Sequence, residues 1–265
     1  MTEQIDVRPA PPSLLAHARC LIVRRVPAGA AVEATVHANA HACFNLIVNG
    51  TVEAEGRALP RFFVCGPLTR PLQTRAIGPL LSVSLVVQPW LLPALAGLRP
   101  THAVDRIVPL DEGAVPGLAA LRAACEAACV DAAAEVEVWS LLARQAAVVA
   151  QPALAQQTLL ADGVAAASRT LGCSTRQIQR RYLAAMGLGP AAWRRLTRWE
   201  QAARGVVTAD ALAEVALGHG YADQAHLTRE TRTVAGVAPA RLRQAAAQGR
   251  EQWSLRPARV RNVQD

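Results

Sequence analysis

Residues 174–182, STRQIQRRY, bring arginine and glutamine side chains together at helical spacing. Arg176, Gln179 and Arg180 stand at positions i, i+3 and i+4, which lie on one face of a helix. A guanidinium group can donate two parallel hydrogen bonds to guanine, and the amide of glutamine can pair in the same way with adenine. The spacing therefore predicts a helix surface that bonds to the flat polar edges of bases.

A second segment, GYADQAHLTRETR at residues 220–232, has the same construction. Its apolar anchor is Leu227, and the outer face of the predicted helix carries Gln224, Thr228 and Arg229. The two segments align at an offset of 49 residues, so that the cap residue Ser174 corresponds to Asp223. Serine and aspartate are both favoured helix N-caps, and each predicts a helix that begins at the next residue.

Short alanine-rich helices are predicted before each segment, at residues 164–171 and 210–217, and a glycine-containing turn follows each of them. Two short helices joined by such a turn form a helix-turn-helix unit. Residues 191–207 predict a further helix that joins the two units. A major groove about 12 Å wide admits one helix, whose N-terminal residues then face the base edges.

The positive charge lies in the half of the chain that holds these units. Residues 1–150 contain 12 arginines and 12 acidic residues, whereas residues 151–265 contain 16 arginines and 8 acidic residues and carry the whole net charge of +8. This asymmetry predicts a polyanionic partner for the second half, double-stranded DNA. The arginines predicted to contact phosphates are Arg181, Arg194, Arg195 and Arg198.

Residues 153–246 resemble the DNA-binding domain of the AraC/XylS family of bacterial transcription regulators. The resemblance rests on STRQIQRRY with GLGP, and above all on ALAEVALGHGYADQAHLTRETRTVAGVAPARLR at residues 211–243. It implies two units held by the joining helix, with base-reading positions at the six residues named above and at Ala225. Thr231 departs from the family pattern, which usually has an aromatic residue there, and this predicts a weaker core in the second unit.

The resemblance is also the only basis for expecting that the protein activates transcription and contacts RNA polymerase. From the residues themselves we predict regulation by sequence-specific DNA binding, with neither catalysis nor a cofactor. The operator sequence and the sign of regulation are not determined by the sequence.

The N-terminal half predicts short strands at residues 20–26, 44–56, 61–67 and 80–87, with a hairpin turn at Asn49-Gly50. Two helices are expected at residues 114–129 and 132–149, and the proline-rich residues 1–13 are expected to form a mobile tail. Residues 14–112 resemble, more weakly, the cupin-like sensor domain of one branch of the same family. That resemblance implies an unknown small-molecule effector or a partner subunit.

The expected fold is therefore α+β with two domains. A cupin-like sensor and dimerisation domain is predicted at residues 14–150, and a helical DNA-binding domain at residues 151–248, with Gln151-Pro152 at the boundary. We expect a homodimer through the N-terminal half or its two helices. The acidic, proline-containing N-terminus does not fit a signal peptide, so we predict a cytoplasmic protein with no membrane segment.

His37 and His41, followed by Glu53 and Glu55, raise an alternative: a metal-dependent cupin enzyme with a regulatory helical domain. Two histidines and a carboxylate can hold a metal, but the spacing H-x-x-x-H differs from the H-x-H expected on a cupin strand. Two ordinary histidines at a loop or strand edge are the competing interpretation. Cys125 and Cys129 stand at positions i and i+4 of a predicted helix. They could share a soft metal or sense oxidants, and the competing interpretation is that they are buried structural thiols.

Overall fold

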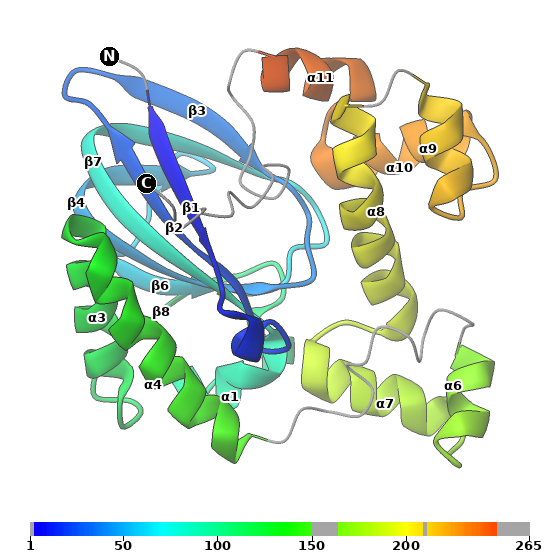
Figure 1. Cartoon of the computed structure of the whole chain (residues 1–265), viewed down its shortest axis with the longest axis horizontal. Coiled ribbons are helices and arrows are strands. Elements are labelled where there is room, and N and C mark those ends of the chain that lie inside the picture. Colours follow the sequence, from blue (N-terminus) through cyan, green and yellow to red (C-terminus); the bar gives the residue numbers. More distant parts are fainter. Residues whose placement is uncertain (1–2, 150–163, 209–210, 248–265) are drawn as a thin grey trace.

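The computed structural model describes residues 3–149, 164–208 and 211–247. Its N-terminal half is a curved antiparallel sheet with helices, and its C-terminal half is entirely helical (Figure 1). The predicted fold class, a β-rich domain followed by a helical domain with two helix-turn-helix units, is confirmed. The predicted boundary at Gln151-Pro152 lies outside the described residues.

The sheet has the strand order β1-β2-β7-β4-β6-β8, with β3 paired to β7 and β5 paired to β4. The longest strand, β7, pairs with β2, β3 and β4, and therefore holds the sheet together. The strands are β1 (Gln4–Pro9), β2 (Ala18–Val26), β3 (Ala31–Val36), β4 (Ala42–Ala54), β5 (Arg57–Ala58), β6 (Phe62–Cys65), β7 (Leu72–Val87) and β8 (Ile107–Pro109).

The helical elements of the N-terminal half are η1 (Pro12–Leu14), η2 (Pro89–Leu91), α1 (Leu92–Ala96), α2 (Pro100–Ala103), α3 (Leu118–Val130), η3 (Ala132–Ala134) and α4 (Glu135–Val148). Those of the C-terminal half are α6 (Val164–Thr170), α7 (Thr175–Met186), α8 (Pro190–Thr208), α9 (Leu212–Gly218), α10 (Gln224–Ala235) and α11 (Pro239–Ala247). Among the described residues, no helix is long and apolar enough to span a membrane.

The expected hairpin turn at Asn49-Gly50 is wrong, because β4 continues through both residues. The pairing of β4 with β7 shifts on both sides of Asn49, which marks a bulge. Gly50 has a φ of 82°, and a Cβ atom there would lie 2.3 Å from the carbonyl oxygen of Pro79. The turn lies instead at Glu55-Gly56, where both residues have positive φ. A glycine with positive φ serves a bulge as well as a turn.

The expected mobile tail is also wrong for most of its length. Residues Gln4–Pro9 form β1, which pairs with β2 in register from Gln4↔Arg25 to Pro9↔Cys20. Ile5 and Val7 alternate with polar residues, and they pack beside Ile22 on one face of the sheet. Six residues with two apolar positions carry a weak strand signal, and the neighbouring prolines obscured it.

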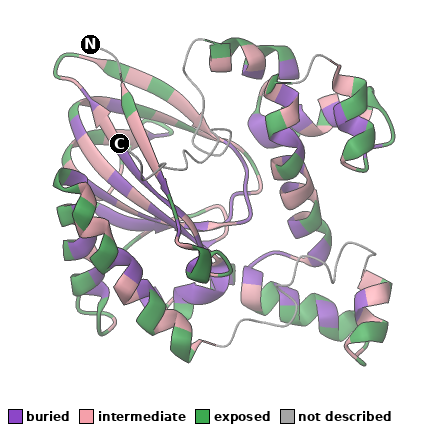
Figure 2. Ribbon diagram, in the orientation of Figure 1, coloured by how far each residue is buried: buried purple, intermediate pink, exposed green. Residues whose placement is uncertain are grey.

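The two faces of the sheet pack against different neighbours. Leu21, Val23 and Leu85 belong to the main core together with Leu118 of α3 and Leu142 of α4, so one face is covered by these two helices. The residues that alternate with them form smaller clusters on the other face. The outer sides of α3 and α4 are exposed, whereas the sheet is largely buried or intermediate (Figure 2).

Candidate nucleic-acid interface

The first predicted reading helix, α7, begins at a capping box. The Ser174 hydroxyl accepts a hydrogen bond from the backbone N–H of Gln177 at 3.3 Å, and the Gln177 Oε1 atom accepts one from the backbone N–H of Ser174 at 2.8 Å. Two of the N–H groups that a helix start leaves unpaired are thereby satisfied. The helix ends at Gly187, whose φ is 73°. The predicted N-cap is confirmed, and α6 packs against α7 across the turn.

The two sides of α7 separate as the spacing predicted. Ile178 and Tyr182 are fully buried, whereas Arg176, Gln179 and Arg180 are exposed together on the outside. Burial also raises the pKa of the Tyr182 phenol, which therefore stays neutral. The three exposed side chains are free to reach a ligand outside the domain, and their contact with bases stays a prediction.

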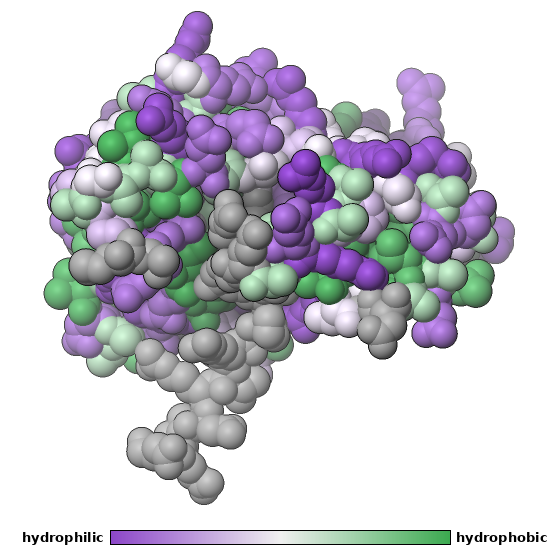
Figure 3. Space-filling model, turned by 90° about the horizontal axis from the view of Figure 1, so that it is seen from above, coloured by the Kyte–Doolittle hydropathy of each residue, from purple (hydrophilic) through white to green (hydrophobic). Residues whose placement is uncertain are grey.

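The second predicted reading helix, α10, repeats this arrangement. The Asp223 Oδ1 atom accepts a hydrogen bond from the backbone N–H of His226 at 2.6 Å, so the predicted cap is confirmed. Leu227 is fully buried, as the sequence indicated. The outward residues are Gln224, Ala225 and Arg229, which are exposed, and Thr228, which is partly buried. Seen from above, much of the surface over the helical half is hydrophilic, with apolar patches between (Figure 3).

Helix α8 joins the two units, with α7 near one of its ends and α9 to α11 near the other (Figure 1). Its buried face includes Trp193, Leu196, Trp199 and Val206. Tyr182 of the first unit meets Trp193 edge to face, with 5.8 Å between ring centroids. The shared core of these helices attaches both α7 and α10 to α8.

The four predicted phosphate contacts fall into two groups. Arg181 and Arg194 are exposed. Arg195 lies 3.4 Å from Glu230 and donates a hydrogen bond to the carbonyl of Thr69 at 3.3 Å, so it also contacts the N-terminal half. The guanidinium of Arg198 lies over the ring of Tyr221 at 4.5 Å. All four assignments stay predictions.

Thr231 occupies a buried position in the core between α10 and α8. Its hydroxyl donates a hydrogen bond to the carbonyl of Leu227 at 2.8 Å and accepts one from the indole N–H of Trp199 at 3.2 Å. A buried indole requires such an acceptor, because an unpaired N–H group would be costly. Thr231, which departs from the family pattern, thus pairs with the buried indole of Trp199. The sequence could have indicated this pairing only if the burial of Trp199 had been known.

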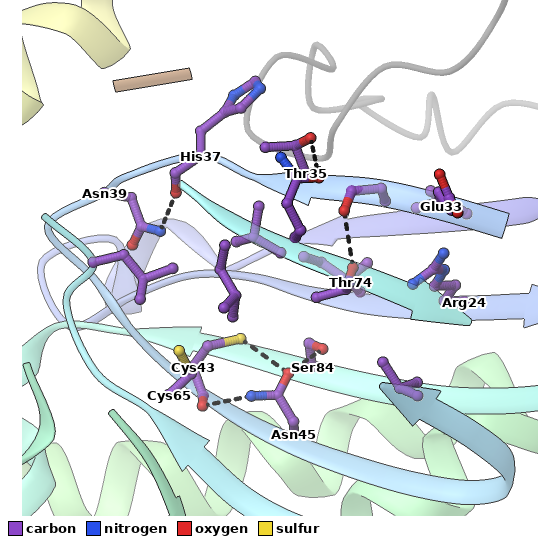
Figure 4. A pocket seen from close by; sticks show the side chains of 18 of the residues that line it. Arg24, Glu33, Thr35, His37, Asn39, Cys43, Asn45, Cys65, Thr74 and Ser84 are labelled. Carbon is purple, nitrogen blue, oxygen red and sulfur yellow. Dashed lines mark hydrogen bonds between the residues drawn. The ribbon is translucent and has the colours of Figure 1, made fainter. Parts of the chain in front are cut away.

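A cavity of about 660 Å³ opens on the sheet face that α3 and α4 leave uncovered. One side holds a neutral polar group, in which the Asn45 Oδ1 atom accepts a hydrogen bond from the Ser84 hydroxyl at 2.7 Å (Figure 4). Apolar residues such as Ile22 and Phe63 surround this group, and α11 contributes Arg241 and Leu242. The cavity therefore combines apolar walls with polar side chains, and charged residues such as Arg24, Glu33 and Arg241 also line it.

His37 and His41 line this cavity, but each also faces α8. The ring of His37 meets the ring of Trp199 edge to face at 5.3 Å, and the Nδ1 atom of His41 lies 3.4 Å from Glu200. Within the residues that the structure describes, no group of three or more His, Cys, Asp or Glu side chains could hold a metal ion. The arrangement does not bring the two histidines to one metal with Glu53 or Glu55.

Cys125 and Cys129 are buried in α3. Burial raises the pKa of Cys125 to about 12 and that of Cys129 to about 11. Thiols that stay protonated are poor nucleophiles, which fits structural residues better than a redox site.

Comparison with known proteins bears on the helical half. Residues 167–245 match a family model described as a helix-turn-helix domain, of the AraC type. The C-terminal half is an AraC-type helix-turn-helix domain. This match agrees with the sequence resemblance, and it supports a DNA-binding transcription regulator of the AraC type.

The solved structures that resemble the chain are distant from it in sequence. ToxT from Vibrio cholerae, in an apo form, is 9% identical and has a TM-score of 0.46, covering 88% of this chain and 98% of that chain. ToxT from Vibrio cholerae bound to (E)-4-(8-methylnaphthalen-1-yl)but-3-enoic acid is 9% identical and has a TM-score of 0.43, covering 91% of this chain and 98% of that chain. The AraC-like transcriptional activator CuxR is 16% identical and has a TM-score of 0.32, covering 92% of this chain and 86% of that chain. No curated protein matches the chain.

Proposed function

We propose that this regulator binds a specific DNA sequence by placing α7 and α10 in successive turns of the major groove. The observation that carries the proposal is the pairing of two capped helices, each with an exposed polar face, on the single helix α8. A recognition helix presents its N-terminal residues to base edges, so the exposed residues of the first turns are the readers.

Each reading helix has its own set of contacts. On α7, Arg176 and Arg180 suit guanine and Gln179 suits adenine. On α10, Gln224, Thr228 and Arg229 offer hydrogen bonds, and Ala225 offers an apolar contact to a thymine methyl group. The phosphate contacts come from four arginines: Arg181, Arg194, Arg195 and Arg198. Of these, Arg195 and Arg198 must first leave the partners that they contact in this structure.

The cavity in the N-terminal half supports a small-molecule effector. Its volume of about 660 Å³ lies within the range of about 300–1,000 Å³ that is usual for ligand sites. Its apolar walls and its neutral Asn45–Ser84 group favour a mainly apolar molecule with a few hydrogen-bonding atoms. The proposal also includes four points: the N-terminal half is a cupin-like sensor domain, the protein is cytoplasmic, it activates transcription, and it contacts RNA polymerase.

A homodimer is also part of the proposal. Val130 on α3 and Val136 and Val148 on α4 are 81%, 65% and 78% exposed. Burying such side chains against a second copy would stabilise an interface. Sedimentation equilibrium of the full chain at micromolar concentration should report about twice the 28.1 kDa of one chain. A monomer mass with and without DNA would contradict it.

The test of the DNA-binding proposal is selection of genomic fragments by the full chain across a salt series. One enriched motif with two half-elements about one helical turn apart is expected, with affinity that falls as salt increases. Arg180→Ala and Arg229→Ala should each cost about 1–3 kcal/mol and each relax a different half-element.

Arg57→Ala is the matched control, because Arg57 is an exposed arginine on β5 of the N-terminal half, away from both predicted reading helices. It should leave the motif unchanged. Uniform weakening by Arg180→Ala and Arg229→Ala on every sequence would mean that both side chains contact phosphates, and the assignment of base readers would then be wrong.

A further inference from the structure

Residues 37–41, between β3 and β4, lie where the sheet side of the cavity meets α8 and α10 of the DNA-binding domain. His37, Asn39 and His41 line the cavity. In Figure 4, His37 lies at the rim and its ring points away from the polar group formed by Asn45 and Ser84. The segment is held on its own side by the bridge between Asn39 and Leu68, whose backbone groups exchange hydrogen bonds of 2.9 and 3.0 Å.

The same segment is bound to α8 through Glu200. The Glu200 carboxylate lies 3.4 Å from the Nδ1 atom of His41 and 3.0 Å from the Nη1 atom of Arg19, with only 10% of its side chain exposed. Burial alone would raise the pKa of Glu200, but the nearby His41 and Arg19 outweigh it and lower the pKa. The carboxylate therefore stays ionised and fixes segment 37–41 against α8.

A second connection leads from this segment to the reading helix α10. The His37 ring contacts Trp199, whose indole N–H donates to the hydroxyl of Thr231. In addition, the backbone N–H of Ala38 donates a hydrogen bond to the carbonyl of Val234 at 2.9 Å. Thr231 and Val234 belong to the helix that carries Gln224 and the other predicted readers of the second unit. Segment 37–41 is thus both a wall of the cavity and a support of α10.

The first unit contacts the N-terminal half elsewhere. Gly187, at the end of α7, packs against the backbone of Pro100 and the side chain of Val104, at α2. A change in segment 37–41 therefore reaches α10 directly, whereas it reaches α7 only through α8. Coupling from the cavity should act chiefly on the second half-element.

We propose that segment 37–41 couples the cavity to the reading helix α10, and that Thr231 is the positioning residue of this link. The proposal rests on the proposed function, since it assigns the regulation of the same cavity. A molecule in the cavity that favours one position of segment 37–41 also favours one position of α10, because the two share the Ala38–Val234 bond and the Trp199 contact. By linkage, DNA bound to α10 must in turn alter segment 37–41.

The experiment compares Thr231→Val with Thr233→Val in the full chain by amide hydrogen exchange. Both threonines lie on α10 and both donate to the carbonyl four residues earlier, but only the Thr231 hydroxyl accepts from Trp199. Valine keeps the shape and removes the hydroxyl. Loss of that acceptor should accelerate exchange of the Ala38 amide by about 5- to 100-fold, and Thr233→Val should leave it unchanged.

Trp199→Phe removes the donor instead of the acceptor, and should accelerate Ala38 exchange in the same way. If both Thr231→Val and Trp199→Phe change exchange only within α8 and α10, the link does not reach the cavity wall and the proposal is wrong. This comparison contains no DNA, so its result is independent of whether the DNA-binding proposal succeeds.

The selected DNA site then tests the functional direction. Bound DNA should change exchange of the Ala38 and Asn39 amides at least about fivefold in the wild type, and the change should be lost in Thr231→Val. Wild-type protein that binds DNA without any change in these amides would overturn the coupling while leaving the proposed function intact.

Discussion

Replacement of Trp199 by alanine is expected to lower the free energy of unfolding by about 3–5 kcal/mol, the range for removing a buried aromatic side chain. Trp199 is fully buried in α8. It contacts His37 of the N-terminal half, and its indole N–H bonds to Thr231 of α10. Alanine would leave a cavity where the two halves meet, and it would also remove the donor to the Thr231 hydroxyl.

Urea denaturation at equilibrium measures this effect, with Leu217→Ala as the control. Leu217 lies in α9 and is 70% exposed, so its replacement should change stability by no more than about 0.5 kcal/mol. If Trp199→Ala lowers the free energy of unfolding by less than about 1 kcal/mol, the surrounding side chains must have closed the cavity. That result would contradict the prediction, which assumes that α8 is held rigidly.

Acidification from pH 7 to pH 5 is expected to cost about 2 kcal/mol of stability through His37 alone. Burial lowers the pKa of His37 to about 4. In the unfolded chain the imidazole titrates near its ordinary value of about 6.5. Below that value the unfolded chain binds a proton that the folded protein excludes. Stability from the neutral ring is therefore fully present above about 6.5 and is lost as pH falls towards 4.

The measurement is urea denaturation of the wild type and of His37→Phe at both pH values. The difference in stability between the two proteins should shrink by about 2 kcal/mol on acidification, because phenylalanine cannot titrate. Glu200, whose pKa is lowered, remains ionised throughout this range and does not contribute. His102→Gln, at an exposed histidine, should track the wild type. An unchanged difference between wild type and His37→Phe would show that the folded protein accommodates a protonated His37.

The interpretation of the strands shows the limit of local patterns. Asn49-Gly50 is a strong hairpin signal, yet the chain continues in β4 because the strand already pairs with β7 on both sides of the bulge. The choice between turn and bulge depends on a partner strand more than 20 residues away. In the same way, residues 4–9 become a strand only because β2 offers a free edge.

The sequence by itself determined the helical half of this protein. Ser174 and Asp223 cap helices that begin at the next residue, and the apolar spacing that buries Ile178 and Leu227 directs the polar residues outward. Caps and helical periodicity act within a few turns of one segment, so they can be read without knowledge of the rest of the chain.

Only the tertiary structure decided the roles of His37, His41 and Thr231. The histidines suggested a metal site because their partners could not be seen, and Thr231 suggested a weakened core. Trp199 and Glu200, which face the two histidines, lie about 160 positions further along the chain. Such contacts form when two halves with their own cores pack together, and no local spacing encodes which side chains then meet.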